Sequence, residues 1–234
     1  MVRRRIVKSS KKSSKWSFFL LGGVVVLLVA VLLVIKLTYD KGEGEILTPA
    51  SVQEQVLKGF ETSNQPYIGD PKAPVVIVEF ADYKCPSCKH WTEDVFSQLK
   101  KAYLDTGKAV FYFVDLPFLA PDSTVAALAG ESLYQQNVDY FWTYYKLMME
   151  QQGNKNDTWA TKEFIMDLVK QNIPGVDLKQ FEQDLDSQKY IGNINADIKI
   201  ADDSQVGGTP TIFVNGNPVE DDSFEGIKAV IEKQ

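Results

Sequence analysis

The chain has 234 residues, of which 44% are hydrophobic, so it can bury a sizeable core and is not a wholly disordered protein. Its formal net charge is −6, but the first 15 residues carry seven basic and no acidic side chains, which leaves 18 basic against 31 acidic side chains in residues 16–234, a net charge of −13. This acidic body excludes nucleic acid as a partner, because binding to phosphates requires a basic face.

The basic leader at residues 1–15 is followed by an apolar stretch at residues 16–37, in which residues 18–35 carry no charge. As a helix the 22 residues of the stretch would be ~33 Å long, enough to cross the hydrocarbon core. Basic flanks stay in the cytoplasm, so the sequence predicts a single-pass signal-anchor in the cell membrane with the remainder on the extracytoplasmic face. A cleaved signal peptide is the alternative, but the stretch is longer than usual and no small-x-small cleavage pattern follows it.

Residues 38–66 are polar and mixed, with three glycines and two prolines. This composition is typical of a stalk or linker, and it predicts a domain at residues 67–234 held away from the membrane.

The domain opens with a strand–helix–strand pattern. Residues 75–80 form a β-branched run whose near-continuous apolarity favours a central strand covered on both faces. A helix is expected over about residues 88–103, where apolar residues recur on one face, and a second strand over residues 109–114. Such a βαβ unit has parallel strands and a right-handed crossover.

A mostly helical insertion is expected over about residues 121–204, with Asp122 or Ser123 capping a helix that begins at Thr124. Further helices are expected near residues 139–151, 161–171, 177–185 and 191–201. A strand at residues 211–214 and the hairpin signal Asn215–Gly216 follow, leading to residues 218–219. A last helix is expected over residues 223–232.

The chain has only two cysteines, Cys85 and Cys88, and they sit three positions apart. No cysteine is left for a structural disulfide, and a structural zinc site needs about four ligands, whereas the only histidine is His90. The pair therefore indicates redox chemistry rather than metal binding, with an inert local disulfide as the alternative.

At a helix N-terminus, unpaired N–H groups and the helix dipole favour a thiolate on the first cysteine, so Cys85 is expected to attack. Cys88, one turn further in, is expected to be shielded and to resolve the mixed disulfide. Pro86 suits the first helical turn. Lys84 and Lys89 either support the thiolate or are simply solvated.

Two segments carry a family resemblance: VVIVEFADYKCPSCKHW (residues 75–91) and GGTPTIFVNG (residues 207–216). They resemble the thioredoxin superfamily, and within it the DsbA-like disulfide oxidoreductases of the membrane-anchored, BdbD-like type found in Gram-positive bacteria. The resemblance covers roughly residues 66–234. It implies an α/β thioredoxin fold with an inserted helical subdomain, here joined to the N-terminal transmembrane helix.

The resemblance also implies roles for individual residues. The Thr209–Pro210 bond is expected to be cis and packed against the cysteines, so that the Thr209 backbone can pair with a substrate peptide beside Pro86 and Ser87. Glu79 is expected to be a buried acid that exchanges a proton with Cys88, although it could also be an inward charge satisfied by lysine or water, or lie on a polar face. Ser87 replaces the histidine common between the cysteines of such enzymes, which leaves the redox strength open, though its hydroxyl can donate to Cys85.

Three other features receive plainer interpretations. His90 is expected on a helix surface. Acidic pairs and triplets are usually solvated loops, although they could help to hold calcium; they are Asp202, Asp203, Glu220, Asp221 and Asp222. An aromatic cluster in the insertion is expected to pack in the core rather than to bind peptides; it comprises Tyr134, Tyr140, Phe141, Trp142, Tyr144 and Tyr145.

By resemblance, the oxidised Cys85–Cys88 pair introduces disulfide bonds into reduced, unfolded secreted or surface proteins, with no cofactor besides that redox-active disulfide. A quinone-linked membrane partner would reoxidise it. Two alternatives stay open: a disulfide reductase or isomerase supplied with electrons by a membrane donor, and a membrane-tethered peptide-binding chaperone whose cysteines are incidental.

Overall fold

The centre of the fold is a parallel pair of strands, β2 (Val75–Ala81) and β3 (Ala109–Asp115), in a computed structural model that describes residues 64–233. The basic leader, the apolar stretch at residues 16–37 and residues 38–63 of the expected stalk lie outside the described residues. Within residues 64–233 every helix is too short or too polar to span a lipid bilayer.

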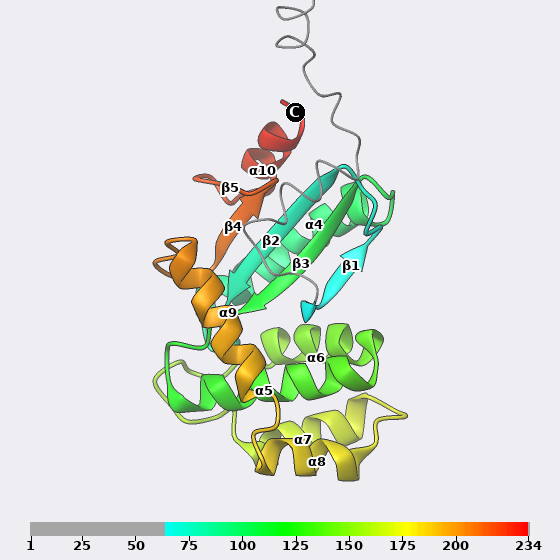
Figure 1. The fold of residues 1–234 in the computed structure, drawn as a ribbon, viewed down its shortest axis with the longest axis vertical. Helices are drawn as coiled ribbons and strands as arrows, with labels where there is room; N and C mark the ends of the chain where they lie inside the picture. The colour runs from blue at the N-terminus through cyan, green and yellow to red at the C-terminus, as the bar shows by residue number, and fades with distance from the viewer. Residues whose placement is uncertain (1–63, 234) are drawn as a thin grey trace, which may run out of the picture. The chain divides into compact units, whose positions relative to one another are not determined.

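Three more strands complete a five-stranded sheet of order β1-β3-β2-β4-β5 (Figure 1). The edge strand β1 (Tyr67–Gly69), which the sequence did not predict, pairs antiparallel with β3. The predicted strand β4 (Thr211–Val214) runs antiparallel to β2, and β5 (Asn217–Pro218) follows it. The predicted hairpin is confirmed: Asn215 and Gly216 both adopt positive φ, as a tight turn between these strands requires.

The apolar run of β2 is buried on both faces, as expected. Its side chains alternate between two cores: Val75, Ile77 and Ala81 face the larger core, whereas Val76, Val78 and Phe80 face a smaller one. The smaller core is closed by α9 (Ile191–Asp203), whose Ile200 and Ala201 pack against it. The position of Glu79 in this alternation puts its side chain on the side of the larger core.

One helical segment connects β2 to β3, and it runs without interruption from Pro86 to Leu104. It comprises α3 (Pro86–Trp91), η2 (Thr92–Phe96), α4 (Ser97–Leu99) and η3 (Lys100–Leu104), of which η2 and η3 are π-helical. The predicted helix is confirmed and begins two residues earlier than expected. A π-turn inside a helix is uncommon and is often found at functional sites.

The helical insertion is confirmed, with four of its helices stacked beyond the carboxyl ends of β2 and β3 and the fifth, α9, lying across one face of the sheet (Figure 1). The four helices are α5 (Pro121–Gln136), α6 (Val138–Glu150), α7 (Lys162–Asn172) and α8 (Leu178–Asp186). The last helix is α10 (Phe224–Ile231), capped by Ser223. One predicted boundary was wrong: α5 begins at Pro121 rather than Thr124. Pro121 occupies its first turn, and the Asp122 carboxylate does not cap the helix because it binds Lys84 and two backbone N–H groups.

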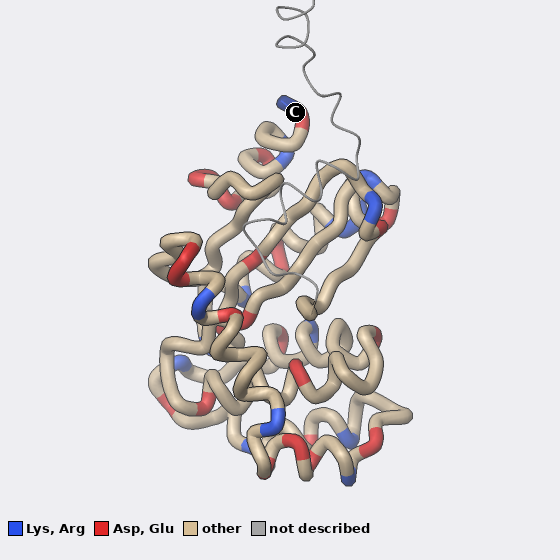
Figure 2. The backbone as a smooth tube through the Cα atoms, viewed as in Figure 1, with Lys and Arg blue, Asp and Glu red and all other residues tan. Residues whose placement is uncertain are grey.

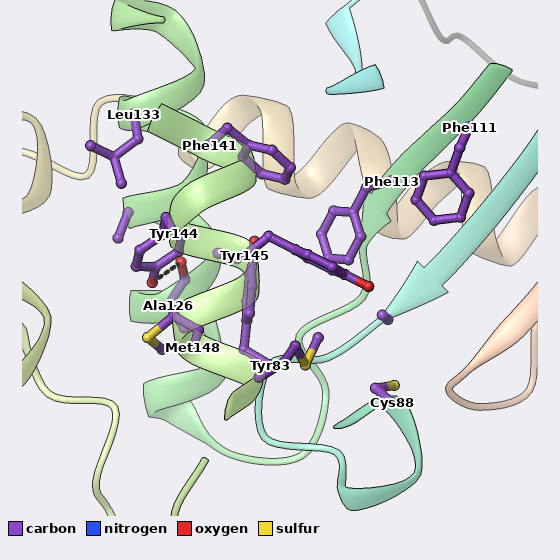
Figure 3. Close-up of a cluster of buried hydrophobic side chains, with 14 of the residues drawn as sticks. Tyr83, Cys88, Phe111, Phe113, Ala126, Leu133, Phe141, Tyr144, Tyr145 and Met148 are labelled. Carbon is purple, nitrogen blue, oxygen red and sulfur yellow. Dashed lines mark hydrogen bonds between the residues drawn. The ribbon is translucent and has the colours of Figure 1, made fainter. Parts of the chain in front are cut away.

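The larger core lies between the sheet and the insertion, and aromatic rings fill it (Figure 3). Core packing is confirmed for Phe141, Tyr144 and Tyr145, which are at most 1% exposed. Tyr134, Tyr140 and Trp142 are partly buried and pack against the same core. Figure 3 shows the Tyr145 side chain extending from α6 towards the sheet, on the side where Cys88 lies.

Charged residues are interspersed along the backbone of the domain (Figure 2). Residues 64–233 contain 26 acidic residues, 15 lysines and no arginine. Because charges of both signs are interspersed, the electrostatic environment of the cysteines depends on which particular groups approach them.

Candidate active site

Cys85 and Cys88 lie at the carboxyl end of the central strand β2, where the chain turns into α3. Asp82 organises this turn: its backbone carbonyl accepts from the Cys85 N–H at 2.9 Å, and its Oδ1 accepts from the Lys84 N–H at 2.8 Å. Its Oδ2 accepts from the N–H groups of Phe118 and Leu119, at 3.1 and 3.0 Å. Asp82 therefore fixes where the helix begins, a role that was not predicted from the sequence.

Both cysteines carry free thiols, so this is the dithiol form. Cys85 is the N-cap of α3 and Pro86 follows within its first turn, as expected. Cys85 is 7% exposed and Cys88 is fully buried. The prediction that the first sulfur is the more accessible one is confirmed, and solution thiols can reach Cys88 only after the site opens or through Cys85.

The two thiols have opposite acidities. The pKa of Cys85 is lowered to about 5, first by the hydrogen bond from the Cys88 thiol and further by the Thr209 side chain and the backbone N–H groups of Cys88 and Ser87. The pKa of Cys88 is raised, chiefly by burial. Ser87 thus stabilises the thiolate through its backbone N–H rather than through the hydroxyl expected from the sequence.

The rate of alkylation of Cys85 should accordingly rise with pH through about 5 and be flat above it, because only the thiolate reacts and the thiolate exists above the pKa. An ordinary cysteine would give a midpoint near ~8.5. The measurement is the rate of reaction with iodoacetamide from pH 3 to 10, with mass spectrometry to assign the modified sulfur.

The matched variant for this measurement is Cys88→Ala, which removes the first of the groups that lower the Cys85 pKa. Its midpoint should move upward but stay below that of a free cysteine, because the Thr209 and backbone contributions remain. A wild-type midpoint near ~8.5 would contradict the assignment of Cys85 as the activated nucleophile.

The two flanking lysines are held by other groups. Lys84 is 1% exposed; its Nζ donates to Asp122 Oδ1 at 2.5 Å and to the Asp157 carbonyl at 2.9 Å. Lys89 donates to the Glu150 carbonyl at 2.9 Å. The interpretation of Lys84 as a solvated lysine was wrong, because the insertion covers this side chain and supplies its acceptors.

The Thr209–Pro210 bond is cis, as expected, and it lies against the cysteines. Cys85 Sγ lies 3.3 Å from the Thr209 carbonyl oxygen, to which the protonated thiol donates. Pro210 also lines a cavity of about 690 Å³ together with Ser87, His90 and Trp91 from the active-site helix and Phe224 from α10. His90 is exposed on this helix, as expected.

Glu79 is fully buried, which confirms the expectation of an acid in the core. Burial raises its pKa to about 8, despite a hydrogen bond from Tyr145 that lowers it, and the charge of Cys85 adds to the rise. The Tyr145 hydroxyl donates to Oε2 of the ionised carboxyl at 3.0 Å, whereas Oε1 has no hydrogen-bond partner within residues 64–233. No lysine therefore neutralises this carboxyl, and near neutral pH it holds a proton that it can transfer.

A separate acidic group lies away from the cysteines. Carboxyl oxygens of Asp115, Glu131 and Asp197 lie within 4.8 Å of one another in the interior, and burial raises the pKa of each. Among the described residues this is the set with spacing suited to a metal ion. The acids named from the sequence, at residues 202–203 and 220–222, are exposed and belong to no such set. Sequence spacing could not reveal the buried group, because its members come from β3, α5 and α9.

Comparison with known proteins gives consistent matches over this domain. Residues 61–233 match the family model described as thioredoxin. The probable disulfide bond formation protein D of Bacillus anthracis is 38% identical over 175 residues, which cover 75% of this chain and 80% of that protein. Disulfide bond formation protein D of Bacillus subtilis is 33% identical over 171 residues, covering 73% of this chain and 77% of that protein.

Solved structures give the same result. The crystal structure of oxidised BdbD from Bacillus subtilis matches with a TM-score of 0.70 and 32% identity, over 74% of this chain and 94% of that one. The structure of Chlamydia trachomatis DsbA matches with a TM-score of 0.68 and 26% identity, over 75% and 93% of the two chains. The matched part is large enough to include the cysteine pair, the sheet and the helical insertion.

Proposed function

This chain belongs to the disulfide bond formation protein D family of thioredoxin-fold protein-disulfide oxidoreductases, and we propose that it introduces disulfide bonds into secreted or surface proteins through Cys85 and Cys88. The single observation that carries the proposal is the contrast between the two sulfurs: an acidic thiol at a helix N-terminus above a buried, weakly acidic one. That contrast assigns different steps to the two sulfurs.

In the oxidised enzyme, a client thiolate attacks Cys85 Sγ, the Cys85–Cys88 bond breaks, and Cys88 leaves as a thiolate that takes up a proton. The client is then joined to Cys85 by a mixed disulfide. A second client thiolate attacks the client sulfur of that bond, which forms the client's disulfide and releases Cys85 as a thiolate. The client loses two electrons and the enzyme gains them.

The direction of the reaction, oxidation of the client, follows from the acidity of Cys85 as a leaving group. A thiol with a pKa of about 5 leaves readily at neutral pH, and stabilising the reduced enzyme in this way makes its disulfide more oxidising. The low pKa of Cys85 does not depend on the Ser87 hydroxyl, so the absence of a histidine between the cysteines does not remove the oxidising character. A reductase would need the opposite balance, with the disulfide form favoured.

The other site residues receive roles in the same cycle. Glu79 supplies the proton that Cys88 takes up, because its carboxyl is buried, protonated near neutral pH and electrostatically coupled to that sulfur. The Thr209 backbone pairs with an extended client segment beside Cys85, and Pro210, Pro86 and Ser87 border that segment. The distance of 3.3 Å between the Thr209 carbonyl and Cys85 Sγ supports this placement.

The proposed setting is the outer side of the cell membrane. Residues 16–37 form the single-pass anchor, the basic residues 1–15 remain in the cytoplasm, and residues 38–63 of the predicted stalk (38–66) hold the domain away from the membrane. Gln65 and Pro66 already belong to the domain, because Gln65 is buried and the Pro66 carbonyl accepts from the Phe113 N–H. The apolar length and the charge asymmetry of the sequence support this arrangement. An enzyme that leaves each cycle reduced needs an oxidant, and we assign that role to a quinone-linked membrane protein with its own cysteine pairs.

The reduction potential of the domain tests the direction of the reaction. We expect a value well above that of thioredoxin, which is about −270 mV, and catalysis of the oxidative refolding of a reduced secreted protein. The potential is measured by equilibration with glutathione buffers, and the refolding by recovery of client activity. A potential at or below the thioredoxin value would overturn the oxidase assignment in favour of a reductase or isomerase.

A further inference from the structure

The buried carboxyl of Glu79 needs a route to solvent if it serves the cysteines repeatedly. Under the proposed function, it gives a proton to Cys88 when the enzyme is reduced and takes one back when the enzyme is reoxidised. Its side chain is fully buried, so water cannot reach it directly. In the dithiol form its pKa of about 8 keeps it protonated near neutral pH, so the proton that it gives to Cys88 is replaced from solvent, and one proton leaves again on reoxidation. These protons must pass through neighbouring groups.

Two hydroxyl groups connect this carboxyl to the surface. The Tyr145 hydroxyl lies 3.0 Å from Glu79 Oε2 and 2.8 Å from Thr92 Oγ1. Thr92 is only half-buried, and its Oγ1 also donates to the Cys88 carbonyl at 2.8 Å. The chain of oxygens thus runs from the carboxyl, through α6, to the π-helical turn that directly follows the cysteines.

The chain of oxygens ends at a cavity of about 490 Å³ between the active-site helix and α6. Thr92 and Tyr145 both line it, and its other walls include Ile68, Phe96, Trp142 and Met149. The groove bordered by Pro210, where the client is proposed to lie, is a different cavity with a different lining. A proton that uses the Thr92 side therefore does not have to pass a bound client.

The hydrogen atoms along this series of oxygens can be arranged in two ways, each of which forms a continuous line of hydrogen bonds. When Glu79 is protonated, it donates to Tyr145, Tyr145 donates to Thr92, and Thr92 donates to the Cys88 carbonyl. When Glu79 is ionised, Tyr145 donates to the carboxylate and Thr92 donates to Tyr145. Each arrangement converts to the other by passing one proton along the oxygens, with Thr92 receiving it from water or releasing it.

We propose that Tyr145 and Thr92 form a proton relay between Glu79 and the cavity beside α6, so that the proton lost or gained by Cys88 is exchanged with solvent on the side away from the client. In the reducing half-cycle one proton moves from water to Thr92, from Thr92 to Tyr145, from Tyr145 to Glu79 and from Glu79 to the Cys88 thiolate. In the oxidising half-cycle it returns by the same steps. Both residues are positioning residues, since they act through Glu79.

Other groups near Glu79 do not offer an equivalent route. The titratable groups that act on it are Tyr145 and the two thiols, and its Oε1 has no hydrogen-bond partner within residues 64–233. The remaining path is through Cys85, which is itself consumed in the mixed disulfide during the step that needs the proton. The relay is therefore the continuous path that stays available while a client is attached.

The exchange of the Cys88 hydrogen with solvent tests the relay without any client, so its outcome is separate from the direction of the enzyme. The chain has two cysteines, and Cys85 is ionised at neutral pH, so the reduced protein has one S–H group, that of Cys88. Its S–H stretch is followed by infrared spectroscopy after Cys85 has been alkylated with iodoacetamide, which closes the path through that sulfur, and the reduced full-length protein has been transferred to D2O. The conversion of S–H to S–D reports the rate at which protons reach the buried sulfur.

Thr92→Val removes the hydroxyl and keeps the shape of the side chain, and it leaves the bond between Tyr145 and Glu79 in place. We expect exchange to slow by about tenfold or more, less than the ~10²–10⁴ typical of general acid–base contributions because local opening gives a slower bypass. Thr92→Ser should restore the wild-type rate. Tyr145→Phe should slow exchange as well, and it should also raise the pKa of Glu79 because it removes the hydrogen bond that lowers it.

The matched control is Tyr144→Phe, because Tyr144 is equally buried in the same helix but donates to the Ala126 carbonyl, which is not part of the proposed relay. It should exchange at the wild-type rate. Thermal unfolding establishes that each variant is folded, and Thr92→Ala serves in place of Thr92→Val if the latter does not fold. Exchange at the wild-type rate in a folded Thr92 variant without a hydroxyl, or equal slowing in Tyr144→Phe, would overturn the relay.

Discussion

Replacing Cys85 by serine should reduce the oxidative refolding of a client to the uncatalysed rate. A serine hydroxyl cannot form the mixed disulfide, and its pKa lies far above that of a thiol lowered to about 5. Cys88→Ser should fail differently. The Cys85 thiolate can still attack a client disulfide and release one client sulfur as a thiolate, but the internal thiol that would free the captured sulfur is gone, so mixed disulfides should accumulate.

The two outcomes are measured by recovery of client activity and by non-reducing electrophoresis with mass spectrometry of the adducts. Ser97→Ala is the control, because Ser97 is exposed on the same helix and its hydroxyl donates to the Glu93 carbonyl, remote from the sulfurs. If Cys85→Ser retained full activity, the protein would be a peptide-binding chaperone with incidental cysteines. The adducts of Cys88→Ser would, in addition, identify the clients.

The parts of this site that the sequence predicted are those governed by local rules. A cysteine followed by proline after a buried strand predicts a helix start, and the helix start predicts an acidic thiol. Glu79 stood out because it interrupts an apolar run, and in an alternating strand such a residue must face one of the two cores. The position of the cis bond came from the family motif, since nothing in local spacing separates a cis from a trans proline.

The parts that the sequence did not predict depend on contacts between distant segments. Tyr145 lies 66 residues from Glu79, and only the folding of α6 against the sheet reveals it as the partner of the carboxyl rather than one more core aromatic. Thr92 lies four residues after Cys88, but its link to Tyr145 spans 53 residues. A hydroxyl in a predicted core carries no sequence signal for the acceptor that it will meet.

Lys84 shows this dependence on distant contacts most clearly, because its position next to Cys85 in the sequence led to a wrong expectation about the surroundings of its side chain. Next to Cys85 it suggested a cation beside the thiolate, whereas its side chain is buried against an acid 38 residues away. Asp122 holds that lysine with Oδ1 and accepts from the N–H groups of Trp159 and Ala160 with Oδ2, both at 3.1 Å. The pair therefore ties the turn before the cysteines to α5 and to the loop that precedes α7.

Lys84→Met should lower the free energy of unfolding by about 3–5 kcal/mol, the usual cost of removing one partner of a buried ion pair. The two side chains are 1% and 4% exposed, so the Asp122 carboxylate would lose its cation without gaining water. Adding Asp122→Asn should recover part of the loss, because the amide oxygen can still accept from Trp159 and Ala160 and no uncompensated charge remains. The free energies come from urea unfolding followed by circular dichroism.

The exposed pair of Lys100 with Asp105 provides the comparison, since its side chains are 41% and 54% exposed. Lys100→Met should cost only ~0–1 kcal/mol, because water screens both charges and replaces the lost contact. An equally small loss for Lys84→Met would mean that water reaches this pair. The turn would then be held by Asp82 alone, whose carboxylate and carbonyl bind four backbone N–H groups around the cysteine motif.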